Sequence, residues 1–136
     1  MSFTSPETFS LYPEEFTAKL EFKDLKEVLK DGKKADFLIL LSHAGLEENK
    51  KIAAGFGQID LIIAGHSQEL LKKPIKAGNA LIVQSGGNLQ NLGRIVLRFD
   101  GKRKLSDYAY EIFPLTNDIP DSPQVLALIK ESKSVR

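Results

Sequence analysis

The spacing of apolar positions changes several times along the chain, and the middle third carries the clearest pattern. Residues 35–41 and 59–64 each form an apolar run without alternation, which predicts strands covered on both faces, as in a parallel sheet. Between these runs, residues 46–54 have apolar side chains at helical spacing. Glu47 and Glu48 fall in the first turn, where the positive end of a helix dipole favours acidic groups. Strand, helix and strand joined by short links predict a βαβ unit.

Weaker patterns predict the elements that precede this unit. Residues 1–15 show no sustained period, and we expect an irregular lead-in there. Alternation at residues 16–22 predicts a strand with one solvated face. Asp24 stands three residues before Glu27, and a glycine follows, which are the start and stop signals of a short helix over about residues 24–31.

The second half of the chain predicts strands and then a helix. Residues 80–84 predict a third strand, and residues 92–99 and 105–113 predict a hairpin around the turn at Asp100-Gly101. A serine N-cap followed by proline at the first helical position begins a terminal helix over residues 122–134. The fold class is therefore α/β, a mixed sheet with a parallel core and a C-terminal antiparallel hairpin, in a single unit without an internal boundary.

Composition excludes several classes of protein. The 19 Lys and Arg residues nearly balance the 18 Asp and Glu residues, and the two signs are interleaved, which argues against a nucleic-acid partner. The longest aliphatic and aromatic run, residues 37–41, is too short to span a membrane. The first 20 residues lack the basic start and apolar core of a secretory signal, and without cysteine there is neither a disulfide framework nor a thiolate metal site. The cellular compartment stays unassigned.

The two histidines of the chain are the main candidates for chemistry. His43 and His66 each follow one of the two apolar strands, and sites in open α/β sheets form where parallel strands end. One histidine in a loop is most often an ordinary surface residue. With two histidines at matched strand ends, a pair of metal ligands becomes as good an interpretation as two ordinary surface residues, because neutral imidazole binds zinc and related ions. Gln68 lies on the same loop as His66, and Ser42 and Ser67 flank the histidines.

Three other features have a plain structural interpretation that we favour. The loop at residues 85–88 could approach a phosphate with its amides, but it lacks the following helix of a phosphate cradle. Lys72 and Lys73 could attract an anion, although a solvated pair of loop charges explains them. Glu47 and Glu48 lie near His43, and the first turn of a helix accounts for them without acid-base chemistry.

Three segments repeat a buried strand followed by a polar loop: DFLILLSHAGLEE at residues 36–48, IDLIIAGHSQ at 59–68, and LIVQSG at 81–86, with Leu92-Gly93-Arg94 beyond. They resemble the second half of the calcineurin-like metallophosphoesterase domain of the 5'-nucleotidase family, and the resemblance covers most of the chain. It implies half of a four-layer sandwich, in which two mixed sheets lie between helices. The Ser-His and Gly-His-Ser-Gln motifs in register make the resemblance fairly specific.

The resemblance implies a dinuclear centre of divalent ions of the zinc, manganese or cobalt class. His43 and His66 match two ligands of one ion, and Gln68 matches a ligand of the other. The ions of such a centre clamp a phosphoester, a nucleotide in the intact enzyme, and activate water. No catalytic residue is matched in this chain, and the substrate-binding residues stay unknown.

The sequence lacks the motifs that the first half of the family's domain should supply. Asp-x-His, Gly-Asp and Asn-His motifs, which should supply the bridging carboxylate and the general acid, occur nowhere in the 136 residues. We therefore interpret residues 1–136 as a partial domain, a fragment or truncated paralogue that binds one ion weakly and is inactive alone. The alternative is a non-catalytic interaction module that self-associates or pairs with the missing N-terminal half through an exposed sheet edge. A weaker alternative is a small regulatory α/β domain whose histidines are incidental.

Overall fold

A five-stranded sheet with a two-stranded hairpin stacked on it forms the body of the protein. The computed structural model describes residues 2–5, 24–30 and 35–134. The sheet has the strand order β1-β2-β3-β5-β4, in which the pairs β1/β2, β2/β3 and β3/β5 are parallel and β4/β5 is antiparallel. Its strands are β1 (Ser2–Thr4), β2 (Ile39–His43), β3 (Leu61–Ala64), β4 (Ile75–Ala77) and β5 (Ala80–Val83).

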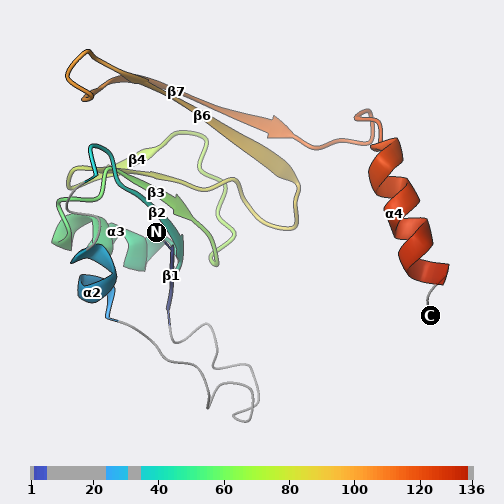
Figure 1. Ribbon diagram of the computed structural model, residues 1–136, viewed down its shortest axis with the longest axis horizontal. Coiled ribbons are helices and arrows are strands. Elements are labelled where there is room, and N and C mark those ends of the chain that lie inside the picture. The colour runs from blue at the N-terminus through green and yellow to red at the C-terminus, as the bar shows by residue number, and fades with distance from the viewer. Residues whose placement is uncertain (1, 6–23, 31–34, 135–136) are drawn as a thin grey trace, which may run out of the picture.

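Helices α2 (Leu25–Lys30) and α3 (Leu46–Gly55) lie on one face of this sheet, and the hairpin of β6 (Asn91–Phe99) and β7 (Leu105–Pro114) lies on the other (Figure 1). The terminal helix α4 (Pro123–Ser134) follows the hairpin and stands apart from the body. The predicted α/β class, the parallel core and the C-terminal antiparallel hairpin are confirmed.

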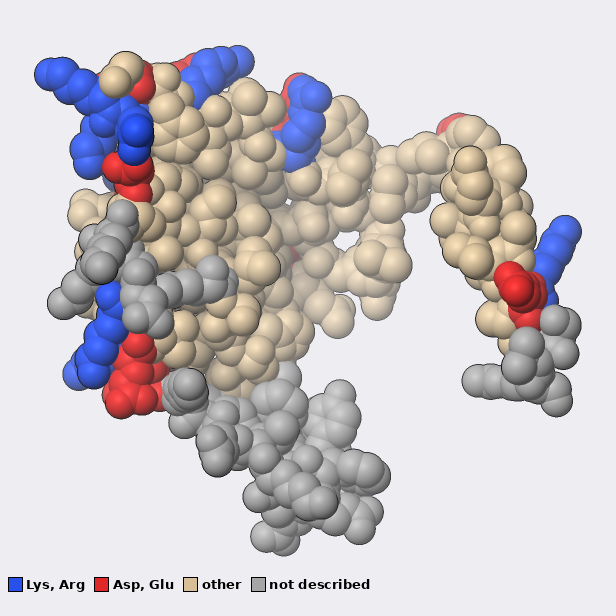
Figure 2. Space-filling view, viewed as in Figure 1, with Lys and Arg blue, Asp and Glu red and all other residues tan. Residues whose placement is uncertain are grey.

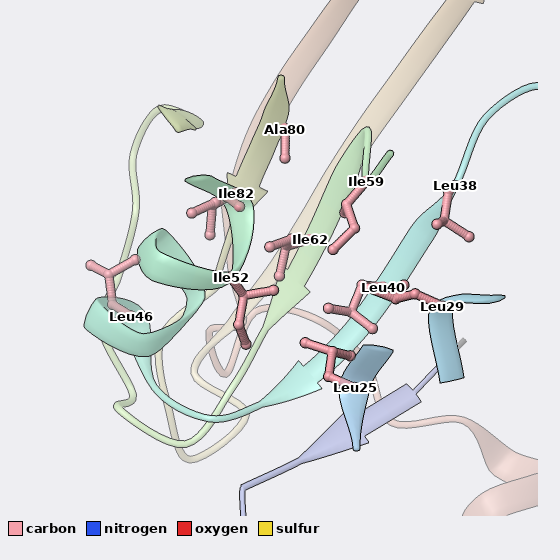
Figure 3. Packing of buried hydrophobic residues seen from close by; sticks show 11 residues of the cluster. Leu25, Leu29, Leu38, Leu40, Leu46, Ile52, Ile59, Ile62, Ala80 and Ile82 are labelled. Carbon is pink, nitrogen blue, oxygen red and sulfur yellow. The ribbon is translucent and has the colours of Figure 1, made fainter. Parts of the chain in front are cut away.

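The larger hydrophobic core fills the space between the sheet and helices α2 and α3. Leu40, Ile62 and Ile82 occupy corresponding positions on β2, β3 and β5, and each is fully buried. Leu25, Leu29, Leu46 and Ile52 reach them from the two helices (Figure 3). Asp24 begins α2 as predicted, because its carboxylate accepts a hydrogen bond from the amide of Lys26 at 2.9 Å.

A second core lies between the sheet and the hairpin. Leu61, Leu81 and Val83 are buried there against Ile95, Leu97 and Tyr110 of the hairpin. At the hairpin turn, the ring of Phe99 meets Phe37 edge to face with centroids 5.2 Å apart, and Arg103 pairs with Asp36 at 2.9 Å. These contacts fix the turn end of the hairpin to the segment that enters β2.

The hairpin covers only part of its face of the sheet. Leu41 of β2 and Ile63 of β3 are register partners, and they remain 51% and 41% exposed. The prediction that both strands are covered on both faces is therefore wrong for their carboxyl halves. In the view of Figure 2, charged side chains of both signs gather toward the edges of the molecule, and no single sign dominates.

The structure corrects several predicted boundaries. Residues 2–4 form β1 and pair in parallel with residues 41–43, so the irregular lead-in expected there is wrong for this stretch. Strand β4 was not predicted at all. Strand β2 begins at Ile39 rather than at residue 35 and includes His43. The strand predicted at residues 16–22 lies outside the described residues. In the described part of the chain, no helix is long and apolar enough to cross a membrane.

Candidate metal centre

The parallel pairing of β2 and β3 brings the two histidines together. Ser42 is the register partner of Ala64, so both strands end at the same edge of the sheet. His43 is the last residue of β2, and His66 comes two residues after the end of β3. The ring centroids lie 5.0 Å apart with an interplanar angle of 70°, and both side chains are exposed. The predicted convergence of the two imidazoles is therefore what the structure shows.

Two glycines shape this contact. A Cβ added at Gly65 would lie 3.2 Å from Nδ1 of His43, so glycine leaves room for that ring. A Cβ at Gly45 would lie 3.6 Å from Cδ2 of His66, an ordinary contact distance, and glycine is needed there because φ is +78°, a conformation that other residues rarely adopt. The amide of Gly65 donates to the carbonyl of Ser42 at 2.8 Å, and the amide of Gly45 donates to the carbonyl of Gly65 at 3.3 Å. The two strand ends are thus tied together by their own backbones.

The turn that carries His66 and Gln68 is conformationally strained. His66 has φ of 78° and Gln68 has φ of 56°, and neither residue is glycine. Such left-handed conformations cost free energy and persist where surrounding contacts enforce them, often at functional sites. Gly87 supplies one such contact, because a Cβ there would lie 2.8 Å from both Cβ and Oε1 of Gln68. The loop at residues 85–88 therefore lies directly against Gln68.

Gln84 is a contributor to this region to which the sequence interpretation assigned no role beyond its place in the segment LIVQSG. It is 3% exposed and follows β5 directly. Its Nε2 donates to Oγ of Ser67 at 3.1 Å, and the Ser67 hydroxyl donates to its Oε1 at 3.3 Å. Ser67 is the residue between His66 and Gln68. The one available signal was a polar residue at the end of the apolar run Leu81-Ile82-Val83.

Tyr110 joins the hairpin to the same point. Its hydroxyl donates to the carbonyl of Gln84 at 3.3 Å, and burial raises the pKa of the phenol above 10.0. A pocket of about 90 Å³ lies beside it, between the sheet and the hairpin. The pocket is lined by Ile63, Ala64, Val83, Gln84, Ser85, Gly93, Ile95 and Tyr110.

The other sequence candidates take structural roles. Glu47 pairs with Lys50 and Glu48 with Lys51, each three residues along α3, as expected for an exposed helical turn. Lys72 and Lys73 are exposed in the loop before β4. Ser42 is buried, and its hydroxyl has no hydrogen-bond partner among the described residues.

The donor set fits part of a metal centre. Two imidazoles that share a zinc ion through nitrogens at about 2.0–2.1 Å in tetrahedral geometry have ring centroids about 5 Å apart, which matches the spacing seen here. Catalytic zinc sites commonly use three protein ligands. Within residues 2–5, 24–30 and 35–134, no three His, Cys, Asp or Glu side chains gather in a way that could hold an ion. The residues present therefore fit an incomplete ligand set.

Comparisons with known proteins give the same partial picture. The chain is 30% identical to an apyrase of Tabanus yao, in a match that covers 79% of this chain and 23% of the apyrase. It is 31% identical to an apyrase of Aedes albopictus, with 76% of this chain and 22% of that protein covered. No protein-family model matches the sequence.

Solved structures extend the likeness to nearly the whole fold. The sulfate thiohydrolase SoxB of Thermus thermophilus superposes with a TM-score of 0.84 at 25% identity, over 99% of this chain and 26% of SoxB. The chain is a partial match to the 5'-nucleotidase family of metallophosphoesterases. A putative 5'-nucleotidase from Staphylococcus aureus shares the fold with a TM-score of 0.74 at 20% identity, over 98% of this chain and 31% of that protein. The chain thus spans less than a third of each relative described here, and the resemblance drawn from its motifs is confirmed.

Proposed function

We propose that this chain is one part of a metal-dependent phosphoester hydrolase of the 5'-nucleotidase type and supplies three of its metal ligands. The observation that carries the proposal is the ring-to-ring placement of His43 and His66 by two adjacent parallel strands. The names of its apyrase and 5'-nucleotidase relatives support a nucleotide or related phosphoester as the substrate of the complete enzyme.

His43 and His66 would hold one divalent ion through their neutral imidazoles, and Gln68 would offer its carboxamide oxygen to a second. Bound in pairs, such ions lower the pKa of water and stabilise the oxygens of an in-line displacement at phosphorus. The β2 and β3 strand ends position the imidazoles, and the contact of Gly87 with Gln68 limits where the carboxamide can lie.

The chain alone is proposed to bind one ion weakly and to lack turnover. Two neutral imidazoles and one amide bring no negative charge to offset two divalent cations. No carboxylate from the described residues joins the histidines, and a general acid is likewise missing from the matched motifs. Because two-metal hydrolysis needs both ions in place, we expect no phosphatase activity from this chain alone.

Titration of the 136-residue chain with Co²⁺ tests the ligand assignment. Visible absorption reports imidazole coordination, and we expect a single ion to bind in the wild type, with binding lost in both His43→Ala and His66→Ala. Ser106→Ala, an exposed change on β7 at the opposite end of the sheet sandwich, is the matched control and should bind as the wild type does. Equal binding in all four proteins would reject the assignment.

A phosphatase assay with Mn²⁺, Co²⁺ or Zn²⁺ tests the expected inactivity. Nucleoside monophosphate and a general aryl phosphate are suitable substrates, because the substrate class rests on the relatives alone. Turnover that disappears in His66→Ala would show that the described chain is catalytically sufficient and would overturn this part of the proposal.

A second candidate function is an interaction module that pairs with another polypeptide. The exposed register partners Leu41 and Ile63, each next to a fully buried residue on its strand, favour it. Among the described residues, the outer edges of the hairpin have no strand partner, which favours this function too, because a two-stranded sheet is marginal alone. Sedimentation velocity over a wide concentration range should then show self-association, together with binding of an apolar dye. A monomer at every concentration without dye binding would count against this function.

A further inference from the structure

The buried side chain of Gln84 is hydrogen-bonded to Ser67, in the turn that carries His66 and Gln68. It is 3% exposed, and its amide engages the Ser67 hydroxyl in both directions, with Nε2 donating at 3.1 Å and Oε1 accepting at 3.3 Å. A buried amide normally has its hydrogen-bonding groups satisfied. Here, both recorded side-chain bonds of Gln84 go to one residue of one turn.

The backbone of Gln84 is itself held firmly. Its carbonyl accepts a hydrogen bond from the Leu71 amide at 3.0 Å and another from the Tyr110 hydroxyl at 3.3 Å. The first donor belongs to the loop before β4 and the second to the hairpin. Gln84 therefore projects its amide from a point that two other parts of the fold fix in place.

The turn that receives this amide needs outside support. His66 and Gln68, on either side of Ser67, both have positive φ, which an unsupported chain avoids at residues other than glycine. The two hydrogen bonds between Gln84 and Ser67 are suited to hold that conformation. Sites of this kind keep their geometry only when neighbouring contacts lock the ligand side chains.

We propose that Gln84 is a positioning residue that fixes the His66-Ser67-Gln68 turn, and so the relative placement of the His66 imidazole and the Gln68 carboxamide, through its bonds to Ser67. For its effect on metal affinity, this proposal rests on the metal-binding function proposed above. The effect on the turn itself is independent of that function.

The experiment compares Gln84→Ala and Ser67→Ala with the wild type in two measurements. The first is the imidazole NMR spectrum without metal, which contains signals from only two histidines. We expect the His66 signals to shift toward unstructured values in both variants, because the ring leaves its edge-to-face contact with His43. The second is the Co²⁺ dissociation constant, which should rise at least about 10-fold, the usual result of removing a residue that supports a metal ligand.

Three further variants separate positioning from general stability. Ser67→Thr keeps the hydroxyl and should retain the wild-type spectrum and Co²⁺ affinity. Asn79→Ala removes a 3.0 Å bond to the carbonyl of Gly57 at the opposite end of β5, and should lower the melting temperature without changing either site measurement. The double variant of Gln84→Ala and Ser67→Ala should be no worse than either single one, because both break the same link.

The outcomes are distinct. A wild-type chain that does not bind Co²⁺ defeats the proposed metal function, and the imidazole spectra then decide the role of Gln84 alone. Unchanged His66 signals in Gln84→Ala and Ser67→Ala overturn the positioning role. Should Gln84→Ala fail to fold, Ser67→Ala decides the matter, because Ser67 is exposed.

Discussion

At the scale of single residues, the site depends on two glycines as much as on its histidines. Gly65 and Gly87 leave room for the side chains of His43 and Gln68. The histidine pair could be predicted because residues that follow parallel strands share one edge of the sheet. The role of Gln84 could not, because its partner Ser67 lies 17 residues away on a turn whose shape no local pattern encodes.

Removing either imidazole should hardly change the stability of the metal-free chain. Both histidines are exposed, and such substitutions usually alter the free energy of unfolding by no more than about 0.5 kcal/mol. His43→Ala and His66→Ala should therefore melt close to the wild type when calorimetry is done with a chelator present. Ile62→Ala, at a fully buried position on β3, should lose about 2–5 kcal/mol and serves as the contrast. A large loss in either histidine variant would identify that ring as part of the core.

Replacing Asn49 should stabilise the protein. The residue is fully buried on the inner side of α3, and neither Nδ2 nor Oδ1 has a hydrogen-bond partner among the described residues. A buried polar group in that state costs about 1–3 kcal/mol, and leucine is also the better helix former. Asn49→Leu should raise the midpoint of urea unfolding, whereas Asn79→Leu at an exposed turn should not. A lower midpoint for Asn49→Leu would show that the amide is satisfied in solution.

At the scale of elements, length separates what could be predicted from what could not. Strands β6 and β7 have 9 and 10 residues, and their patterns and the Asp100-Gly101 turn identified them. Strands β1 and β4 have three residues each, too few to show a period. Strand β1 is defined by its pairing with β2, a contact that joins residues about 39 positions apart in the register, such as Ser2 and Leu41. Such pairing is decided by the assembled sheet and not by local sequence.

The attachment of the hairpin to the sheet should weaken at alkaline pH through Tyr110. Its folded-state pKa is raised above 10.0 by burial, so the folded protein keeps the phenol proton after the unfolded chain has lost its own. Stability from this group is complete below about pH 10 and falls as the pH rises from the unfolded pKa through the folded one. In urea titrations at several alkaline pH values, Tyr110→Phe should show a shallower decline than the wild type.

Tyr108→Phe is the control for this pH effect. Tyr108 lies two residues earlier on β7 and is 40% exposed. Its variant should follow the wild-type pH dependence. Parallel pH profiles for all three proteins would mean that the Tyr110 phenol titrates alike in the folded and unfolded chains.

At the scale of the whole molecule, the chain has a buried hydrophobic core, but one face of its sheet is only partly covered. The α/β class and the order of the main elements follow from the sequence, because continuous apolar strands separated by an amphipathic helix allow few arrangements. How far the hairpin covers its face of the sheet does not follow from the sequence. Leu41 and Ile63 belong to apolar runs that look fully buried, yet the hairpin reaches only the first half of each strand.

Deleting helix α4 should leave the stability of the body unchanged. Residues 123–133 of the helix are exposed, among them Val125, Leu128 and Ile129, and Figure 1 shows the helix standing clear of both sheets. A helix of 12 residues without tertiary packing is marginal in water, so it adds little to the cooperative unit. A chain ending at Thr116 should melt within about 2 °C of the wild type, a range that corresponds to a few tenths of a kcal/mol for a domain of this size.

The same truncation tests where the apolar surface of the molecule resides. Because the helix exposes a row of apolar side chains, a chain without it should bind less apolar dye at equal concentration, while far-ultraviolet circular dichroism should lose only the signal of one short helix. Hydrogen exchange at amides of β2, β3 and β5 should be the same in both chains, since those strands lie in the cores that hold the body together. Faster exchange in those strands after truncation, or a melting temperature lower by more than about 5 °C, would show that α4 packs on the body in solution and covers part of the exposed sheet face.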